Sequence, residues 1–247
     1  GIKCAAKVST VSPGYLQELR YEANGLENFF EYEKGKCYGI LNGIDNDVWN
    51  PGNDVYIEEN FGLEDFENKK SANKKVLCDQ FNLDENKPLI VFIGRLVAEK
   101  AADLLPSAIS DCIYHMEGRM NYLILGSGEY WVEQQLQNLR SHFFGYYNSQ
   151  IGYNEKLSHQ MYAGADFLLM PSRVEPCGLN QMYAMRYGTI PIVRNTGGLK
   201  DTVKDFGDKG GYGICFDNAT VWDISYSVHR AIQLYDQQER INEIRKQ

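Results

Sequence analysis

The stretch Met170–Val203 reads MPSRVEPCGLNQMYAMRYGTIPIVRNTGGLKDTV, and it decides the fold. Its pattern predicts a buried strand over 166–170, a tight turn that carries Glu175, a short helix, a second strand over 189–193, and a Gly-Gly turn into another helix. Because the first turn of a helix presents unpaired N–H groups and the positive end of the helix dipole, both turns favour a bound anion. The stretch therefore predicts a site for a phosphorylated substrate, with the Glu175 carboxylate beside it.

Strands and helices alternate regularly on both sides of this stretch, from Pro88 to the end of the chain. The run 89–93 is continuously apolar, as in strands that a parallel sheet buries on both faces. Five or six βα units in succession predict an α/β fold, an open Rossmann-like parallel sheet with helices on both faces. In such sheets ligands bind beyond the carboxyl ends of the strands. The other expected strands are 122–125, 147–151 and 212–216, and the other expected helices are 103–115 (with Asp103 as N-cap), 129–143, 154–162 and 219–246.

The residues before Pro88 have a different character. The chain begins Gly1-Ile2 without an initiator Met, so we expect a fragment or a processed chain. The segment after residue 37 is polar and carries the turn signals Asn42-Gly43 and Pro51-Gly52, which predict a linker near 35–55. We therefore divide the chain into a remnant of a preceding lobe (1–37, with a strand over 7–12 and a helix over 15–21), a linker and lobe start (38–87, with a helix over 63–81), and a Rossmann-like lobe (88–247).

Composition excludes several classes of protein. A hydrophobic content of 43% supports a packed core, and the formal net charge of −8 argues against nucleic acid and against an acidic membrane surface as partners. No apolar run approaches the roughly 18 residues that a membrane span needs. The six cysteines form no CxxC pattern and the four histidines show no metal spacing, so we expect a reducing compartment, no metal site and no cofactor.

Two cations follow the first strand of the lobe, in the sequence GRLVAEK. Arg95 supplies a fixed fork of donors and Lys100 a mobile point charge, a combination that suits a diphosphate. The alternative is that both are solvated surface charges. Gly126-Ser127-Gly128 follows the next strand, but position 131 is Trp, so this is not a complete dinucleotide fingerprint; we expect a tight turn beside the ligand.

Other candidates also lie directly after predicted strands. Tyr153 follows Ile151-Gly152 and could stack on a base or merely pack. Glu175, between Arg173 and Pro176, is either a ligand contact or a salt-bridged turn residue. Cys177 has no His nearby in sequence, so a packing or wall role is favoured over that of a nucleophile. Backbone N–H groups are expected from Gly178, Leu179, Thr196, Gly197, Gly198 and Leu199.

The motifs EPCGLNQ and TGGLKDTV, together with FIGRLVAEK, LNGIDNDVW and TVSPGY, resemble the carboxyl-terminal half of bacterial glycogen synthases and plant starch synthases. The resemblance covers nearly the whole chain. It implies the GT-B fold, in which one Rossmann-like lobe binds an α-1,4-glucan acceptor and the other binds the nucleotide sugar. It also implies transfer of glucose from ADP-glucose, or UDP-glucose, to the non-reducing end of the glucan with retention, in a bacterial cytoplasm or a plastid stroma.

The same resemblance implies roles for individual residues. Arg95 and Lys100 match the pair that grips the diphosphate, and Glu175 matches the carboxylate beside the donor glucose. Tyr153 matches the aromatic residue against the base. The residues expected to line the sugar and phosphates are Cys177, Gly178, Leu179 and Asn180, with Thr196, Gly197 and Gly198 at the second phosphate-side turn.

Two departures from the family matter. Ala101 stands where the family usually has Gly, which alters the backbone beside the phosphates. The family's amino-terminal Lys-x-Gly-Gly loop and the catalytic His of the first lobe have no counterpart in these residues. We therefore expect the chain alone to bind the nucleotide sugar weakly and not to turn it over. A non-catalytic nucleotide- or sugar-binding module of the same fold is the alternative, whereas a dehydrogenase would need a full GxGxxG that the chain lacks.

Overall fold

A six-stranded sheet forms the centre of the structure, a computed structural model that describes residues 1–247. The strands lie in the order β5-β4-β3-β6-β7-β8, and every neighbouring pair is parallel. The chain reverses its direction of winding between β3 and β6, and in sheets of this kind ligands bind at such a point. The strands are β3 (Leu89–Ile93), β4 (Asn121–Gly126), β5 (Tyr147–Ile151), β6 (Phe167–Met170), β7 (Ile190–Arg194) and β8 (Ile214–Phe216). The expected Rossmann-like parallel sheet is confirmed.

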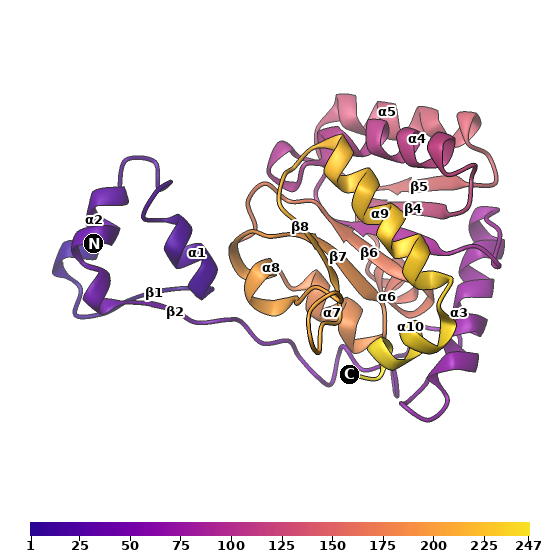
Figure 1. The fold of residues 1–247 in the computed structure, drawn as a ribbon, viewed down its shortest axis with the longest axis horizontal. Coiled ribbons are helices and arrows are strands. Elements are labelled where there is room, and N and C mark those ends of the chain that lie inside the picture. The colour runs from indigo at the N-terminus through magenta and orange to yellow at the C-terminus, as the bar shows by residue number, and fades with distance from the viewer.

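Helices cover both faces of this sheet (Figure 1). One face packs against α4 (Leu105–His115), α5 (Tyr130–His142), α9 (Val221–Tyr235) and α10 (Gln238–Arg245). The other packs against α3 (Phe66–Phe81), α6 (Glu155–Gly164), α7 (Asn180–Arg186) and α8 (Gly197–Thr202).

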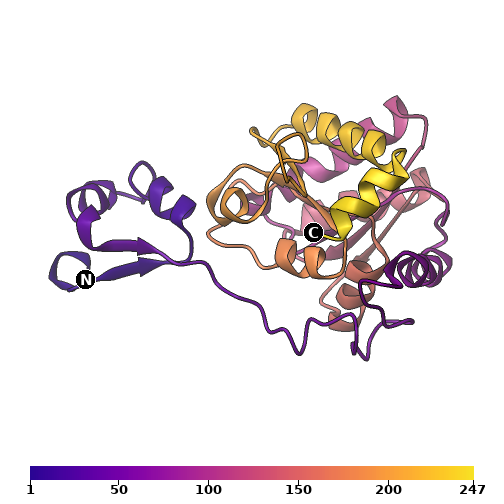
Figure 2. The same ribbon diagram turned by 60° about the horizontal axis from the view of Figure 1, so that its bottom comes forward.

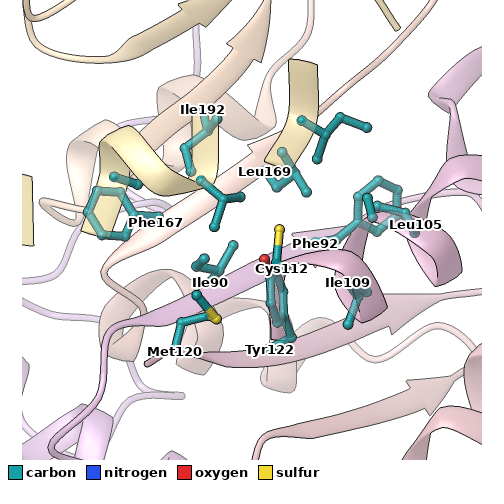
Figure 3. Packing of buried hydrophobic residues seen from close by; sticks show 14 of the residues in the cluster. Ile90, Phe92, Leu105, Ile109, Cys112, Met120, Tyr122, Phe167, Leu169 and Ile192 are labelled. Carbon is teal, nitrogen blue, oxygen red and sulfur yellow. The ribbon is translucent and has the colours of Figure 1, made fainter. Parts of the chain in front are cut away.

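Two hydrophobic cores result, one on each side of the sheet. Successive side chains of a strand point to opposite faces, so Ile90 and Phe92 of β3 enter the first core while Leu89 and Val91 enter the second. Figure 3 shows the first core, where strand residues meet Leu105 and the rest of α4. The continuously apolar pattern of β3 is therefore explained by burial on both faces.

A buried carboxylate with two buried cations joins three elements at the amino end of β6. The Asp166 carboxylate accepts from Lys74 Nζ of α3 at 2.7 Å, from Arg245 Nη2 of α10 at 2.6 Å, and from the Leu89 N–H at 2.9 Å. Burial alone would raise the pKa of Asp166, but the charges of Lys74 and Arg245 outweigh it and hold the pKa below its ordinary value. The pair thus ties α3 and α10 to the sheet.

The first 39 residues form a small module beside the lobe (Figures 1 and 2). Its parallel strands, β1 and β2, are joined through α1 and α2, and α1 packs against α8 of the lobe. Ser12 caps α1, because its Oγ accepts from the Tyr15 N–H at 3.0 Å and Pro13 occupies the first helical turn. From residue 40 to residue 65 the chain runs along the lobe to α3 without a helix or strand. The module consists of η1 (Ile2–Cys4), β1 (Val8–Thr10), α1 (Pro13–Glu18), α2 (Glu27–Tyr32), η2 (Lys34–Lys36) and β2 (Cys37–Gly39).

Two expectations of secondary structure are wrong in detail, whereas the expected domain division stays a prediction although its first boundary meets a strand. The boundary at residue 37 falls inside β2, which pairs with β1 through Gly39. Asp103 is not the N-cap of α4: it lies in a short 3-10 turn and binds Arg173 through two hydrogen bonds, of 2.5 and 2.8 Å. The paired charge-assisted bonds are stronger than a single cap bond.

The expected helix over 219–246 is two helices. It breaks at Asp236-Gln237, between α9 and α10. The break allows Ile241 and Ile244 to return to the core on which α9 already packs.

Candidate functional site

The candidate site lies at the carboxyl ends of β3, β4, β5 and β6, around the point where the winding reverses. Lys100 of the loop after β3 reaches Glu175 of the loop after β6, with 2.5 Å between Nζ and Oε2. The Ser172 hydroxyl donates to the same oxygen at 2.9 Å. Glu175 is 6% exposed, so this anion is held almost out of water by one cation and one hydroxyl. The structure brings together two of the three residues expected to act on the substrate.

Arg173 does not pair with Glu175. Its guanidinium binds Asp103 and also donates to the Ala98 carbonyl at 2.7 Å. The hydrogen bonds from Arg173 lower the pKa of Asp103. Arg173 therefore joins the loops after β3 and β6, and it leaves the Glu175 carboxylate free to face Lys100.

A cavity of about 310 Å³ opens at the carboxyl ends of β3, β4 and β5, and its lining includes Arg95, Tyr153 and Asn180 but neither Lys100 nor Glu175. Arg95 lies on its rim, largely exposed, and its guanidinium pairs with Glu99 at 3.1 Å. The Tyr153 ring is 87% exposed, so it is not a packing residue. Asn180 lines the opposite wall and donates to the Ile93 carbonyl at 2.7 Å. The cavity can accept a flat ring system together with an anionic group.

Gly94 and Gly126 line this cavity, and glycines allow the loops after β3 and β4 to approach closely. A Cβ on Gly126 would lie 1.9 Å from the Gly94 carbonyl oxygen, and one on Gly128 would lie 2.3 Å from that of Leu96. The loops after β3 and β4 are in direct backbone contact, with the Leu96 N–H donating to the Ser127 carbonyl. Gly128 forms an isolated parallel bridge with Leu96 rather than the expected tight turn, so these glycines allow the two loops to approach closely.

The turn before α7 is closed by its own side chains. Gly178 has a φ of 72°, a conformation that favours glycine, and Gln181 Nε2 donates to the carbonyls of Cys177 and Gly178. Cys177 is buried, and its backbone carbonyl lies where a Cβ on Gly198 would be. Cys177 is therefore packed against the turn before α8, and its role as a wall of the donor site stays a prediction. Leu179 lies at the N-cap position of α7 and is half-buried.

The turn before α8 binds a carboxylate of the protein itself, that of Glu18. Glu18 of α1 accepts from the Gly197 N–H at 2.7 Å and from the Thr196 hydroxyl at 3.1 Å. The Gly198 N–H donates to the Glu175 carbonyl at 3.0 Å. In this structure a carboxylate and a carbonyl accept from these N–H groups, and the phosphate-side role expected of Thr196, Gly197 and Gly198 stays a prediction.

Ala101 has a φ of 53° and is fully buried. This left-handed conformation, directly after Lys100, explains in physical terms why a glycine suits the position.

The sequence interpretation missed the contribution of the linker. Trp49 lines the cavity and is stacked between the rings of His159 and Tyr183, with centroid distances of 4.0 and 3.8 Å. Asp54 anchors the same segment, because its Oδ2 lies 2.7 Å from His159 Nδ1 and accepts from the Tyr187 hydroxyl at 2.5 Å. The one available signal was the motif LNGIDNDVW, which carries Trp49.

Other structural observations bear on function class. No group of three or more His, Cys, Asp or Glu side chains is arranged to hold a metal ion. None of the helices has the length and apolar character that crossing a membrane requires. All six cysteines are free thiols.

Comparison with known proteins identifies close sequence relatives. Residues 73–247 match the family of glycosyl transferases group 1. A glycogen synthase from Flavobacterium johnsoniae is 57% identical over 244 residues, which are 99% of this chain and 51% of the relative. A glycogen synthase from Geobacillus stearothermophilus is 40% identical, over 93% of this chain and 48% of the relative. The chain thus spans about half the length of the curated relatives it matches.

Solved structures agree with the sequence comparison. The catalytic domain of Starch Synthase IV from Arabidopsis thaliana, bound to ADP and acarbose, matches with a TM-score of 0.90 at 35% identity, covering 99% of this chain and 52% of that one. Sucrose-phosphate synthase from Thermosynechococcus elongatus, with a TM-score of 0.67 at 17% identity over 99% of this chain and 53% of that one, shares the fold alone. The chain therefore belongs to the glycosyl transferases of group 1, and it is similar to glycogen and starch synthases over about half of their length.

Proposed function

We propose that this chain is the donor-binding lobe of a two-lobed glycogen or starch synthase. The complete enzyme transfers glucose from ADP-glucose, or UDP-glucose, to the non-reducing end of an α-1,4-glucan with retention. The observation that carries the proposal is the Lys100–Glu175 pair at the switch point of the sheet, on the same loops after β3 and β6 that carry Arg95 and Asn180 to the cavity. The bacterial relatives favour a bacterial cytoplasm over a plastid.

The reaction places opposite charges on the two sides of the bond that breaks. The bond between the glucose anomeric carbon and the diphosphate oxygen is cleaved, so negative charge develops on the leaving diphosphate and positive charge on the sugar ring. Lys100 and Arg95 stabilise the diphosphate, and Glu175 stabilises the ring. Charge-assisted hydrogen bonds of this kind contribute on the order of 1.5–3 kcal/mol each.

The cavity supports a position for the nucleotide. Tyr153 offers an exposed ring for the base, and Asn180 lines the cavity. Cys177, Gly178 and Leu179, which connect Asn180 to Glu175 in the sequence, are assigned to the sugar and phosphates. ADP is favoured over UDP because the structure of Starch Synthase IV, at 35% identity, is bound to ADP. Thr196, Gly197 and Gly198 act indirectly, by supporting the Glu175 turn.

Calorimetric titration tests the donor site directly. The chain should bind ADP and ADP-glucose more tightly than UDP and UDP-glucose, and Lys100→Met should weaken the binding of ADP by about tenfold, since one lost charged contact of about 1.4 kcal/mol is a factor of ten. Equal affinities for wild type and Lys100→Met would contradict the assignment.

The chain by itself should bind donor weakly and transfer no glucose, because the acceptor lobe is contributed by other residues of the family's enzymes. A glucosyl-transfer assay of these 247 residues with ADP-glucose and glycogen checks this. Robust turnover would contradict it.

A further inference from the structure

Three backbone segments meet behind Glu175 with no room for a side chain between them. A Cβ on Gly14 would lie 2.4 Å from the Gly197 carbonyl oxygen, and a Cβ on Gly197 would lie 2.0 Å from that of Glu175. The segments are residues 12–14 of the amino-terminal module, the Glu175 turn, and the turn before α8. Movement of one of them is therefore transmitted to the others.

Hydrogen bonds fix the carbonyls of the Glu175 turn one after another. Arg194 donates to the carbonyls of Ser172 and Arg173 at 2.7 and 2.6 Å. The Gly198 N–H donates to the carbonyl of Glu175 at 3.0 Å. The next carbonyl, that of Pro176, accepts from the Ser12 hydroxyl at 2.6 Å.

Ser12 is the one member of this set that comes from the amino-terminal module. It is completely buried, and its hydroxyl both donates to Pro176 and accepts from the Tyr15 N–H. Six residues further along, Glu18 holds the turn before α8 through Gly197. The module thus contacts the Glu175 turn directly through Ser12, and indirectly through Glu18, which binds the turn before α8.

We infer that Ser12 is a positioning residue for Glu175: its hydroxyl fixes the Pro176 carbonyl and thereby the direction in which the Glu175 carboxylate points. The inference rests on the proposed role of Glu175. Ser12 touches neither the cavity nor Lys100, so its loss affects the chemical step and leaves donor binding nearly unchanged.

Kinetics of the complete two-lobed enzyme test the inference. Ser12→Ala should lower kcat by about 10- to 100-fold, since small displacements of a reacting group have effects of this size, with the KM for ADP-glucose changed by less than about twofold. Ser12→Thr keeps the hydroxyl and should restore kcat. Asp201→Ala is the matched control: Asp201 accepts from the Gly14 N–H at 2.6 Å, at the same interface, but does not bind the Glu175 turn. Its kcat should stay near that of wild type.

Two results would overturn the inference: a rise in KM without a fall in kcat, or an equal loss of kcat in Ser12→Ala and Asp201→Ala. If Ser12→Ala does not fold, Ser12→Cys replaces it, because a thiol of similar size is only a weak donor. Hydrogen exchange separates this inference from the proposed function. Ser12→Ala should speed exchange of the Gly198 N–H by about tenfold, as expected for a locally loosened turn, and Asp201→Ala should not. An inactive parent enzyme with this exchange result would contradict the proposed function and leave the positioning by Ser12 intact; an unchanged exchange rate would contradict the positioning.

Discussion

At the residue scale, Glu175 lies where a carboxylate is costly to bury, and two donors stabilise it there. Lys100 supplies the compensating charge and Ser172 a hydroxyl, both to the same oxygen. An unpaired buried carboxylate would cost several kcal/mol. The other oxygen accepts no hydrogen bond from the protein, so the carboxylate keeps acceptor capacity for a sugar.

We predict that Glu175→Gln, in the two-lobed enzyme, lowers the rate of glucosyl transfer by roughly 100- to 1000-fold, because the neutral amide no longer stabilises positive charge on the sugar ring. Initial rates with ADP-glucose and glycogen measure this. Glu64→Gln is the control, since Glu64 is exposed. A rate for Glu175→Gln within tenfold of wild type would contradict the role.

Gly126→Ala should lower the free energy of unfolding by about 2–3 kcal/mol, because the added methyl collides with the backbone of the adjacent loop. Gly43→Ala is a matched control with nothing within 4 Å of the added Cβ, and it should be neutral or slightly stabilising. Urea denaturation of the two variants makes the comparison. Equal stabilities would mean that the two loops separate without cost.

Part of the site could be predicted from single residues. Lys100 and Glu175 come after buried strands, and a parallel sheet brings such positions to one edge, so their meeting follows from the pattern. The occupant of the Gly197 turn could not be predicted, because Glu18 is 179 positions away in the chain and belongs to a different module. The N-terminus of a helix favours an anion, but the sequence does not predict which anion binds there.

At the element scale, Asp166 shows how buried charges fix the order of packing. It binds one cation from α3 and one from α10, and these helices cover opposite faces of the sheet. Both helices depend on the same carboxylate, so its loss affects the two cores together.

We predict that Asp166→Ala lowers the free energy of unfolding by about 3–5 kcal/mol, because two buried cations lose their partner. The pKa of Asp166 is lower in the folded state than in the unfolded state. Its contribution is therefore complete above the ordinary carboxyl pKa of about 3.9 and is lost as the pH falls through the lower folded value.

Urea midpoints between pH 7 and pH 2 measure this dependence. The fall in stability at acid pH should be smaller in Asp166→Asn than in wild type, and unchanged in Asp47→Asn, whose side chain is exposed. An acid dependence in Asp166→Asn identical to that of wild type would contradict the assignment.

The elements of the lobe were predictable because their patterns are strong. The apolar run of β3 predicts a buried strand. The starts of α6 and α9 are predicted by their N-cap residues, Asn154 and Thr220, each of which accepts from an N–H of the first turn. The pairing of β1 with β2 could not be predicted, because each strand has only three residues and the two are far apart in sequence. The break between α9 and α10 depends on where the core ends, which no local pattern records.

At the scale of the whole molecule, the cavity includes a segment that lies outside the α/β pattern. The linker carries Trp49 to the cavity wall, and the bonds from His159 and Tyr187 to Asp54 hold the linker there. Neither end of the linker is part of the sheet. The cavity is therefore formed by residues at the ends of the strands and by Trp49 of the linker.

A protein that starts at residue 40 should keep the affinity for ADP of the whole chain within about threefold, because it retains the linker and every residue of the cavity. One that starts at residue 73 should bind ADP at least about tenfold more weakly or fail to fold, since each buried hydrogen bond left without its partner costs about 1–3 kcal/mol. Calorimetric titration and thermal unfolding of the two proteins distinguish these outcomes. Equal affinity in both would show that the linker is dispensable.

The anchoring of Trp49 through Asp54 has a practical consequence for where such a protein is cut. The family match begins at residue 73, inside α3 and well after the tryptophan. A laboratory that shortened the gene to the matched region would discard part of the nucleotide's enclosure and would expose the imidazole of His159. The residues that match the family model are therefore fewer than the residues that a bound nucleotide would contact, because Trp49 lies outside the match.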